Sequence, residues 1–186
     1  MFAYDFLKKP RQVGAILPSS AKLAWAMTEN ISLENARNIA ELGAGTGAFT
    51  KQILRKKSAA ASFFAVEIDT KMATKLAARF ENLDIEAGRA QDLRAFLQRR
   101  NLGRLDAVVS GIPWTFLSER EQDELLGIIR ECLNDGGCFT TFIYAFCSPI
   151  KRRRFARKLH AFFSELSAPK IVWKNIPPAF VYQCRK

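Results

Sequence analysis

Short apolar runs alternate along this chain with segments whose apolar residues have helical spacing. Short apolar runs, rich in Ile, Val and Phe, predict strands at about 37–42, 62–67, 83–87, 105–110 and 138–144. Between them, apolar residues spaced three or four apart predict helices ending near Lys57 and spanning about 69–80, 91–100 and 118–133. Strands alternating with helices predict an α/β fold with a doubly wound, mainly parallel sheet.

The two ends of the chain depart from this rhythm. Residues 2–9 predict a short amphipathic helix, and a second helix is expected at about 20–30. We therefore divide the chain into an N-terminal part, 1–30, and an α/β domain, 31–186. Near the other end, a basic helix at about 150–163 precedes two extended runs, Lys170 to Asn175 and Phe180 to Cys184, which predict a hairpin.

A glycine-rich turn follows the first predicted strand, in the stretch Glu41-Leu42-Gly43-Ala44-Gly45-Thr46-Gly47. Glycine lacks a Cβ, so such a turn lets a nucleotide-like ligand approach bare backbone. Glu67 ends the next strand, where a carboxylate meets ribose hydroxyls in nucleotide-binding folds. A solvated loop charge is the alternative for Glu67.

The excess of basic over acidic residues indicates which kind of partner the protein binds. The chain has 29 Lys+Arg against 18 Asp+Glu, a formal net charge of +11, which suggests a nucleic acid or an anionic membrane surface. Solubility alone is the alternative explanation. The longest uncharged stretch, Gly136 to Ile150, has 15 residues and is shorter than the roughly 20 needed to span a bilayer.

The cysteine and histidine content argues against a metal site. The four cysteines form no C-x-x-C pair and the chain has one histidine, so we expect no metal. We expect core thiols in a reducing cytoplasm and see no secretory signal.

The glycine turn, with Glu41 before it, resembles motif I of the class I S-adenosylmethionine (SAM) methyltransferases. Further segments are similar, in order along the chain, to the soluble bacterial phospholipid N-methyltransferases: Val13 to Ser20, Glu41 to Gly47, Val108 to Pro113, Phe142 to Tyr144 and Val172 to Ala179. This resemblance covers nearly the whole chain. It implies a Rossmann-like sheet of seven strands ending in an antiparallel hairpin.

The resemblance also implies SAM as cofactor and a set of residues that bind it. These residues are Ser19, Ser20, Glu41, Gly43, Gly45, Thr46, Gly47, Glu67, Ile68, Ala90, Gln91 and Ser110. The glycines would face the amino acid part of SAM, Glu67 the ribose, and Ala90 or Gln91 the adenine.

The reaction that the resemblance implies is methylation of the amine of phosphatidylethanolamine or its methylated forms. Tyr144, Ser110 and Trp114 are the expected catalytic residues, with Tyr144 and Trp114 holding the methylammonium by cation–π contact. A core tyrosine with a satisfied hydroxyl is the alternative for Tyr144. No proton acceptor stands out, and His160 is expected at the surface of the basic helix.

A soluble enzyme with this substrate has to dock on the bilayer from the cytoplasm. Residues 2–9 and the basic segment 151–158 are the expected docking elements, at about 1 kcal/mol per Lys or Arg near an anionic surface.

An RNA or small-molecule methyltransferase is the competing hypothesis, because Val109 to Trp114 looks like the N-L-P-Y motif of rRNA adenine dimethyltransferases. Gly111 stands where that motif has asparagine, and we expect no C-terminal RNA-binding domain, so nucleic acid is disfavoured. A membrane-binding protein with a relic SAM pocket is a third hypothesis.

Overall fold

The computed structural model describes residues 19–186. The amphipathic helix expected at 2–9, and the part of the resemblance that covers 13–18, lie outside the described residues. The first described helix, α2 (Ala21–Thr28), begins after the N-cap Ser20, whose hydroxyl accepts a hydrogen bond from the Leu23 backbone N–H at 3.1 Å. It packs on the sheet through Leu23 and Met27.

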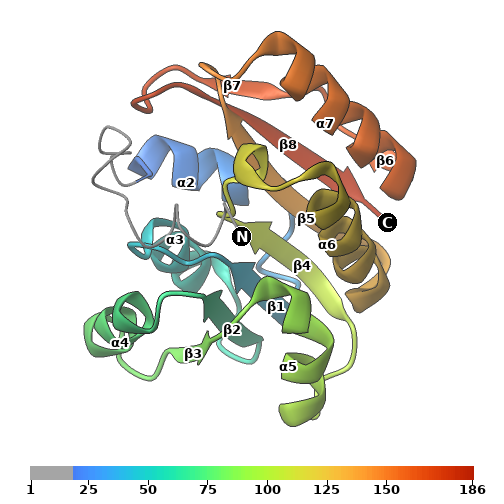
Figure 1. Cartoon of the computed structure of the whole chain (residues 1–186). Helices are drawn as coiled ribbons and strands as arrows, with labels where there is room; N and C mark the ends of the chain where they lie inside the picture. The colour runs from blue at the N-terminus through green and yellow to red at the C-terminus, as the bar shows by residue number, and fades with distance from the viewer. Residues whose placement is uncertain (1–18) are drawn as a thin grey trace.

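Five parallel strands form most of the sheet (Figure 1). They are β1 (Asn38–Leu42), β2 (Ser62–Glu67), β3 (Asp84–Ala87), β4 (Leu105–Ser110) and β5 (Leu133–Tyr144). Their order is β3-β2-β1-β4-β5, with β1 in register between β2 and β4. The crossovers from β1 to β2 and from β3 to β4 place the chain reversal beside β1, where ligands bind in doubly wound sheets.

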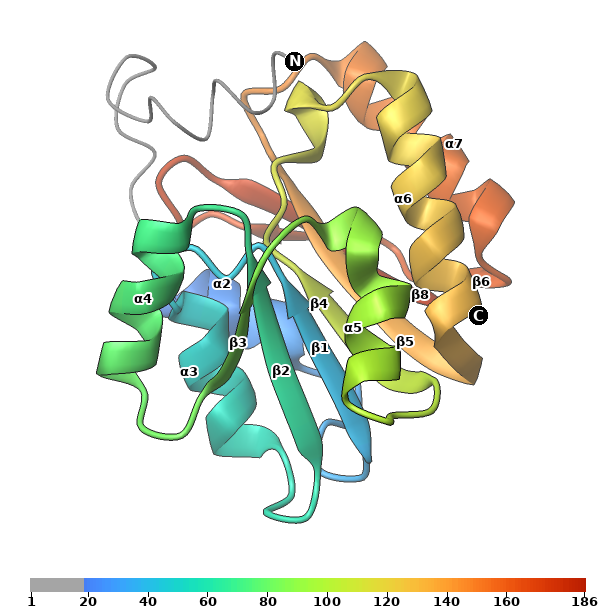
Figure 2. The same cartoon turned by 60° about the horizontal axis from the view of Figure 1, so that its bottom comes forward.

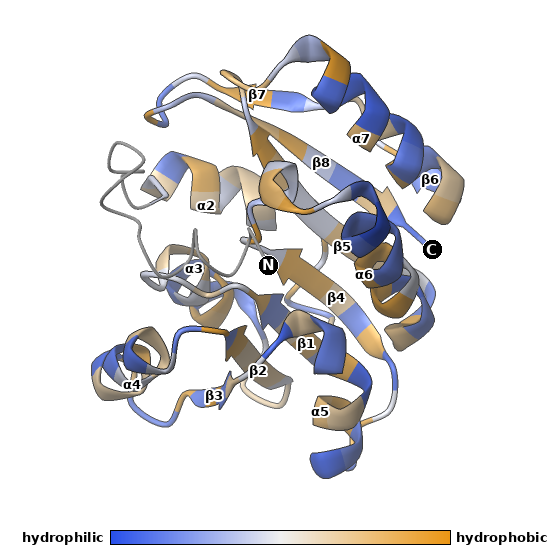
Figure 3. Cartoon of the chain, viewed as in Figure 1, coloured by the Kyte–Doolittle hydropathy of each residue, from blue (hydrophilic) through white to orange (hydrophobic). Residues whose placement is uncertain are grey.

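Helices cover both faces of the sheet (Figures 1 and 2). One face carries α2, α3 (Ala48–Lys56) and α4 (Thr70–Arg79). The other carries α5 (Leu93–Arg99), α6 (Glu119–Cys132) and α7 (Pro149–Phe162). Two short 3-10 helices, η1 (Ala90–Asp92) and η2 (Trp114–Phe116), follow β3 and β4. Each face therefore has its own apolar core, and Figure 3 shows that most of β2 and β4, between these cores, is coloured as hydrophobic.

The C-terminal strands run antiparallel to β5. Strand β8 (Ala179–Arg185) pairs with β5 along its length. Strands β6 (Glu165–Leu166) and β7 (Lys170–Val172) both pair with β8, at opposite ends of it. The sheet has eight strands, but β6 and β7 share one strand position, interrupted before β7 by Pro169, which cannot donate to a ladder. The expected α/β fold with its antiparallel C-terminal hairpin is confirmed.

The fifth strand begins earlier than its sequence predicts. We expected a turn at 134–137 and a strand from 138, whereas β5 starts at Leu133, opposite Leu105. The register then shifts, because 134–137 form a bulge in which Gly136 adopts a φ of +76°. The turn chemistry was read correctly, but pairing with β4 keeps the segment inside the strand.

Candidate cofactor-binding site

A cavity of about 170 Å³ opens at the carboxyl ends of the parallel strands. Its walls come from the turns after β1, β2, β3 and β4 and from α6. They are formed by Gly43, Gly45, Val66, Glu67, Ile68, Gly88, Ala90, Gln91, Gly111, Ile112, Pro113, Leu117 and Leu125. Six of the expected cofactor-binding residues are therefore brought together here: Gly43, Gly45, Glu67, Ile68, Ala90 and Gln91.

The glycine turn is shaped by positive backbone angles. Gly43 has a φ of +77° and Gly45 a φ of +53°, a region that other residues rarely adopt. A Cβ on Gly43 would lie 3.2 Å from Ile112, so this turn packs tightly against the loop after β4. A Cβ on Gly45 would meet no protein atom within 4 Å, which leaves bare backbone facing open space.

The Glu67 carboxylate is buried and holds the turn in place. Its Oε2 accepts a hydrogen bond from the Gly45 backbone N–H at 2.7 Å, and its Oε1 accepts one from the Asp69 N–H at 3.0 Å. A carboxylate has about four lone-pair sites, so Glu67 can still accept hydrogen bonds from a diol. The solvated loop charge considered above is wrong for this residue.

Glu41 lies behind the turn and does not line the cavity. Its side chain is fully buried, and Oε2 accepts a hydrogen bond from the Thr50 hydroxyl at 2.6 Å. Burial raises the pKa of Glu41 to about 8, partly offset by the hydrogen bonds from Thr50. Because Thr50 is in α3, Glu41 ties β1 to this helix and orients the turn between them. Its Oε1 has no hydrogen-bond partner among the described residues.

Gly111 is required by the contact between the β1 and β4 loops. A Cβ at this position would lie 2.4 Å from the Gly43 carbonyl oxygen, a distance that only a backbone shift relieves. The Gly111 N–H also donates to the Leu42 carbonyl at 2.8 Å. In this chain, the packing therefore excludes an asparagine at the position where the adenine methyltransferase motif has one.

Several expected cofactor residues do not line this cavity. Thr46 is exposed, and Gly47 packs against α4, where a Cβ would lie 2.6 Å from Phe80. The Ser110 side chain is buried, and its hydroxyl accepts a long hydrogen bond from the Ile112 N–H at 3.4 Å. Ser20 caps α2, as described above, and Ser19 is half-buried beside it.

The two aromatic candidates also stand apart from the cavity walls. Trp114 is 1% exposed and packs against Phe139 and Phe155 in the core, so the expected cation–π contact with a substrate at Trp114 is not supported. Tyr144 ends β5, is half-buried, and stacks on Phe146 at 5.5 Å between ring centroids. Burial raises the pKa of its hydroxyl to about 12.

The expected site omitted several wall residues: Val66, Gly88, Gly111, Ile112, Pro113, Leu117 and Leu125. Most directly precede or follow a predicted strand end, so the rule that ligands bind at these ends was the signal available for them. Leu125 lies in the middle of α6 and carries no such signal.

Residues 19–186 contain no cluster of three or more side chains that could bind a metal ion. Nor is any helix in that range both long and apolar enough to cross a bilayer. All four cysteines are free and buried, as expected of core thiols.

The cavity residues fit SAM. The turn leaves bare backbone open to a ligand, Glu67 has lone pairs that can accept hydrogen bonds from a diol such as that of a ribose, and Ile68 and Ala90 give the wall an apolar part, which suits a flat aromatic ring. Helix α3 starts at this turn with no side-chain cap at Gly47, and helix N-termini favour a carboxylate.

Comparisons with known proteins agree with this site. Residues 39–137 match the family described as "Methyltransferase domain". The ornithine lipid N-methyltransferase of Singulisphaera acidiphila is 33% identical over 190 aligned positions, covering 100% of this chain and 94% of the relative.

Solved structures share the fold at low sequence identity. An O-methyltransferase from Bacillus cereus in complex with SAH has a TM-score of 0.70 at 16% identity, covering 98% of this chain and 91% of that one. The O-methyltransferase TomG from Streptomyces achromogenes in complex with SAM has a TM-score of 0.67 at 15% identity, with coverages of 99% and 89%. The expected cofactor, SAM, is confirmed by these matches, and the chain belongs to the methyltransferase domain family of SAM-dependent enzymes.

Proposed function

We propose that this enzyme transfers a methyl group from SAM to the amine of a membrane lipid. The observation that carries the proposal is the cavity at the strand ends, whose walls include the Gly45 backbone and the Glu67 carboxylate. The name of the Singulisphaera relative, a lipid N-methyltransferase, supports an amine on a lipid as the acceptor.

Two lipid classes are candidate acceptors. The sequence resemblance to phospholipid N-methyltransferases favours an aminophospholipid such as phosphatidylethanolamine or its methylated forms. The 33% identical relative favours an ornithine lipid. Both present an amine nitrogen, so the same transfer chemistry serves either one.

The chemistry asks the protein to align the amine, exclude water and keep the nitrogen neutral. SAM, when bound, supplies an electrophilic methyl group on its sulfonium. Ile112, Pro113 and Leu117 give the cavity an apolar wall on the β4 side, and an apolar wall lowers the pKa of an amine brought against it. Of the described residues that line the cavity, only Glu67 has an ionisable side chain. Its two carboxylate oxygens already accept hydrogen bonds from the backbone N–H groups of Gly45 and Asp69. Alignment and desolvation therefore carry more of the catalysis than a side-chain base.

Tyr144 is the residue that we propose on the acceptor side. It ends β5, next to the strand whose loop carries Gly111. With a pKa of about 12, its hydroxyl stays protonated at neutral pH, so it acts as a hydrogen-bond donor and an aromatic face rather than as a base.

Peripheral attachment to an anionic bilayer completes the proposal. Helix α7 carries the whole basic segment 151–158, and of these residues Arg154 pairs with Glu119 and Lys158 with Asp123. Lys151, Arg153 and Arg157 are exposed, with no ion pair found for them among residues 19–186, and remain available to lipid phosphates.

The deciding experiment offers labelled SAM and one acceptor at a time. The acceptors are phosphatidylethanolamine, its monomethyl form and ornithine lipid, each in anionic vesicles, with ribosomal RNA and free ethanolamine alongside. We expect label in a lipid and none in the RNA or the free amine. Label in RNA while every lipid stays blank would overturn the proposal.

A further inference from the structure

Two loops place large apolar side chains in solvent. The loop after β5 carries Phe146, which is 64% exposed, and the first turn of α7, which follows this loop, carries Ile150, 65% exposed. The loop from β7 to β8 carries Trp173, 72% exposed, and Ile176, 70% exposed. Exposed apolar residues are ordinary when scattered singly, but four of this size on two adjacent loops and the helix turn that follows one of them mark an interaction surface.

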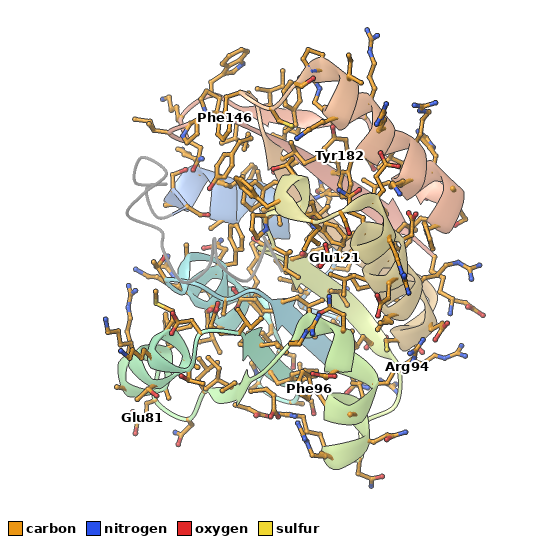
Figure 4. All side chains as sticks on the ribbon, viewed as in Figure 1. Glu81, Arg94, Phe96, Glu121, Phe146 and Tyr182 are labelled. Atoms are coloured by element: carbon orange, nitrogen blue, oxygen red, sulfur yellow. The ribbon has the colours of Figure 1, made fainter. Side chains whose placement is uncertain are left out.

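A backbone hydrogen bond joins the two loops. The Ala145 N–H in the first loop donates to the Pro178 carbonyl in the second at 2.7 Å. Tyr144 pairs with Ala179 just below this bond, and Phe146 stacks on the Tyr144 ring. Figure 4 shows Phe146 at the end of the molecule where β7 lies.

The second loop is pinned from inside by Asn175. This side chain is buried, accepts a hydrogen bond from the Ser20 N–H at 2.9 Å and donates one to the Pro177 carbonyl at 2.7 Å. Its neighbours Trp173 and Ile176 therefore point outward because the loop is anchored by a polar residue. A loop selected for stability alone would turn its apolar side chains inward and its asparagine outward.

The charge around these side chains has a single sign. Segments 145–153 and 173–178 contain Lys151, Arg152, Arg153 and Lys174, and neither segment contains Asp or Glu. Large exposed apolar side chains with Lys and Arg around them are suited to the surface of an anionic bilayer. At such a surface, Trp and aliphatic side chains insert at the headgroup boundary and basic side chains bind lipid phosphates.

The exposed apolar surface lies at the same edge of the sheet as the cofactor cavity. Strands β4 and β5 are parallel, and β8 starts beside the end of β5. Both loops therefore lie at the carboxyl edge of the sheet, the edge at which the cofactor cavity opens.

We propose that Phe146, Ile150, Trp173 and Ile176 form a two-loop docking surface that inserts into an anionic bilayer and turns the cofactor cavity toward it. The proposal rests on the proposed function for its choice of a bilayer as partner. A lipid amine then reaches the site from the interface, without leaving the membrane.

Vesicle sedimentation tests the surface without using enzyme activity. The variant Trp173→Ser/Ile176→Ser removes one tryptophan and one aliphatic side chain from the surface. The matched control, Trp25→Ser/Leu54→Ser, removes the same residue types from α2 and α3, where both side chains are also partly exposed. With phosphatidylglycerol-containing vesicles, we expect the first variant to bind about tenfold more weakly or worse, and the control to bind like the wild type. Equal binding of the first variant and the wild type would overturn the proposal.

Fluorescence gives a second readout on a nearly unaltered chain. In Trp25→Phe, the remaining tryptophans are Trp114, buried in the core, and Trp173. Brominated lipids quench a tryptophan that enters the bilayer, so we expect quenching that disappears in Trp25→Phe/Trp173→Phe. Absence of quenching with vesicle-bound protein would refute insertion by this loop.

The experiments distinguish a failure of the proposed lipid acceptor from a failure of the proposed docking surface. If no lipid accepts a methyl group but Trp173 is quenched, the docking surface stands and the acceptor is wrong. If lipid is methylated without quenching, the acceptor stands and the docking surface is wrong.

Discussion

Replacing Glu67 by glutamine tests the cofactor site most directly. The carboxylate accepts backbone hydrogen bonds from Gly45 at 2.7 Å and Asp69 at 3.0 Å, and we place it against the ribose of SAM. A glutamine keeps one acceptor oxygen but presents an NH₂ group to the other N–H donor. One bond to a charged acceptor is lost, which is worth about 1.5–3 kcal/mol of unfolding free energy.

The same change weakens the cofactor complex. A ribose hydroxyl that donated to a charged oxygen then meets a neutral amide, and a loss of about 1.4 kcal/mol corresponds to tenfold in Kd. We therefore expect Glu67→Gln to bind SAM at least about tenfold more weakly, measured by titration calorimetry below the unfolding temperature.

Asp106→Asn is the matched control. Asp106 also accepts backbone hydrogen bonds, from Arg37 at 2.8 Å and Asn38 at 3.0 Å, but it lies near the amino end of β4, away from the cavity. It should lower the stability by a similar amount and leave SAM affinity unchanged. If Glu67→Gln binds SAM like the wild type, or if both variants lose affinity equally, the assignment of Glu67 to the cofactor is refuted.

Two further predictions concern the buried parts of the site. Gly111→Ala should weaken SAM binding and lower the melting temperature, because its Cβ would lie 2.4 Å from the Gly43 carbonyl; Gly103→Ala, where a Cβ meets nothing within 4 Å, should do neither. Calorimetry and thermal melts that rank the two variants equally would contradict this. Burial holds the pKa of Glu41 at about 8, above its ordinary value of 4.5, so the folded state retains a proton that the unfolded state loses. The stabilising contribution of this proton is complete below pH 4.5 and is lost as the pH rises through about 8, with a slope of up to about 1.4 kcal/mol per pH unit. Urea unfolding between pH 5 and 8 should show that the wild type loses stability relative to Glu41→Gln; parallel pH profiles would refute the assignment.

The sequence by itself determined the order of elements and the edge of the sheet at which the cavity opens. Strand and helix periods are local properties, and the turn Gly43 to Gly47 with Glu67 after the next strand identifies the cofactor edge once the sheet is parallel. The starts of α4 and α6 are also local features, because the N-caps Asp69 and Ser118 accept hydrogen bonds from backbone N–H groups within the first turn of each helix.

Only the tertiary structure decided which side of each strand end faces the cavity. Ser110 and Gly111 are adjacent in sequence, yet the serine is buried and the glycine forms the wall, because successive residues at a strand end point to opposite sides. The Trp114 side chain is of a type that forms cation–π contacts, but it is buried in the core against Phe155 of α7. The same long-range packing leaves Trp173 in solvent, since the buried position in its loop is held by Asn175, whose partner Ser20 is 155 residues away along the chain.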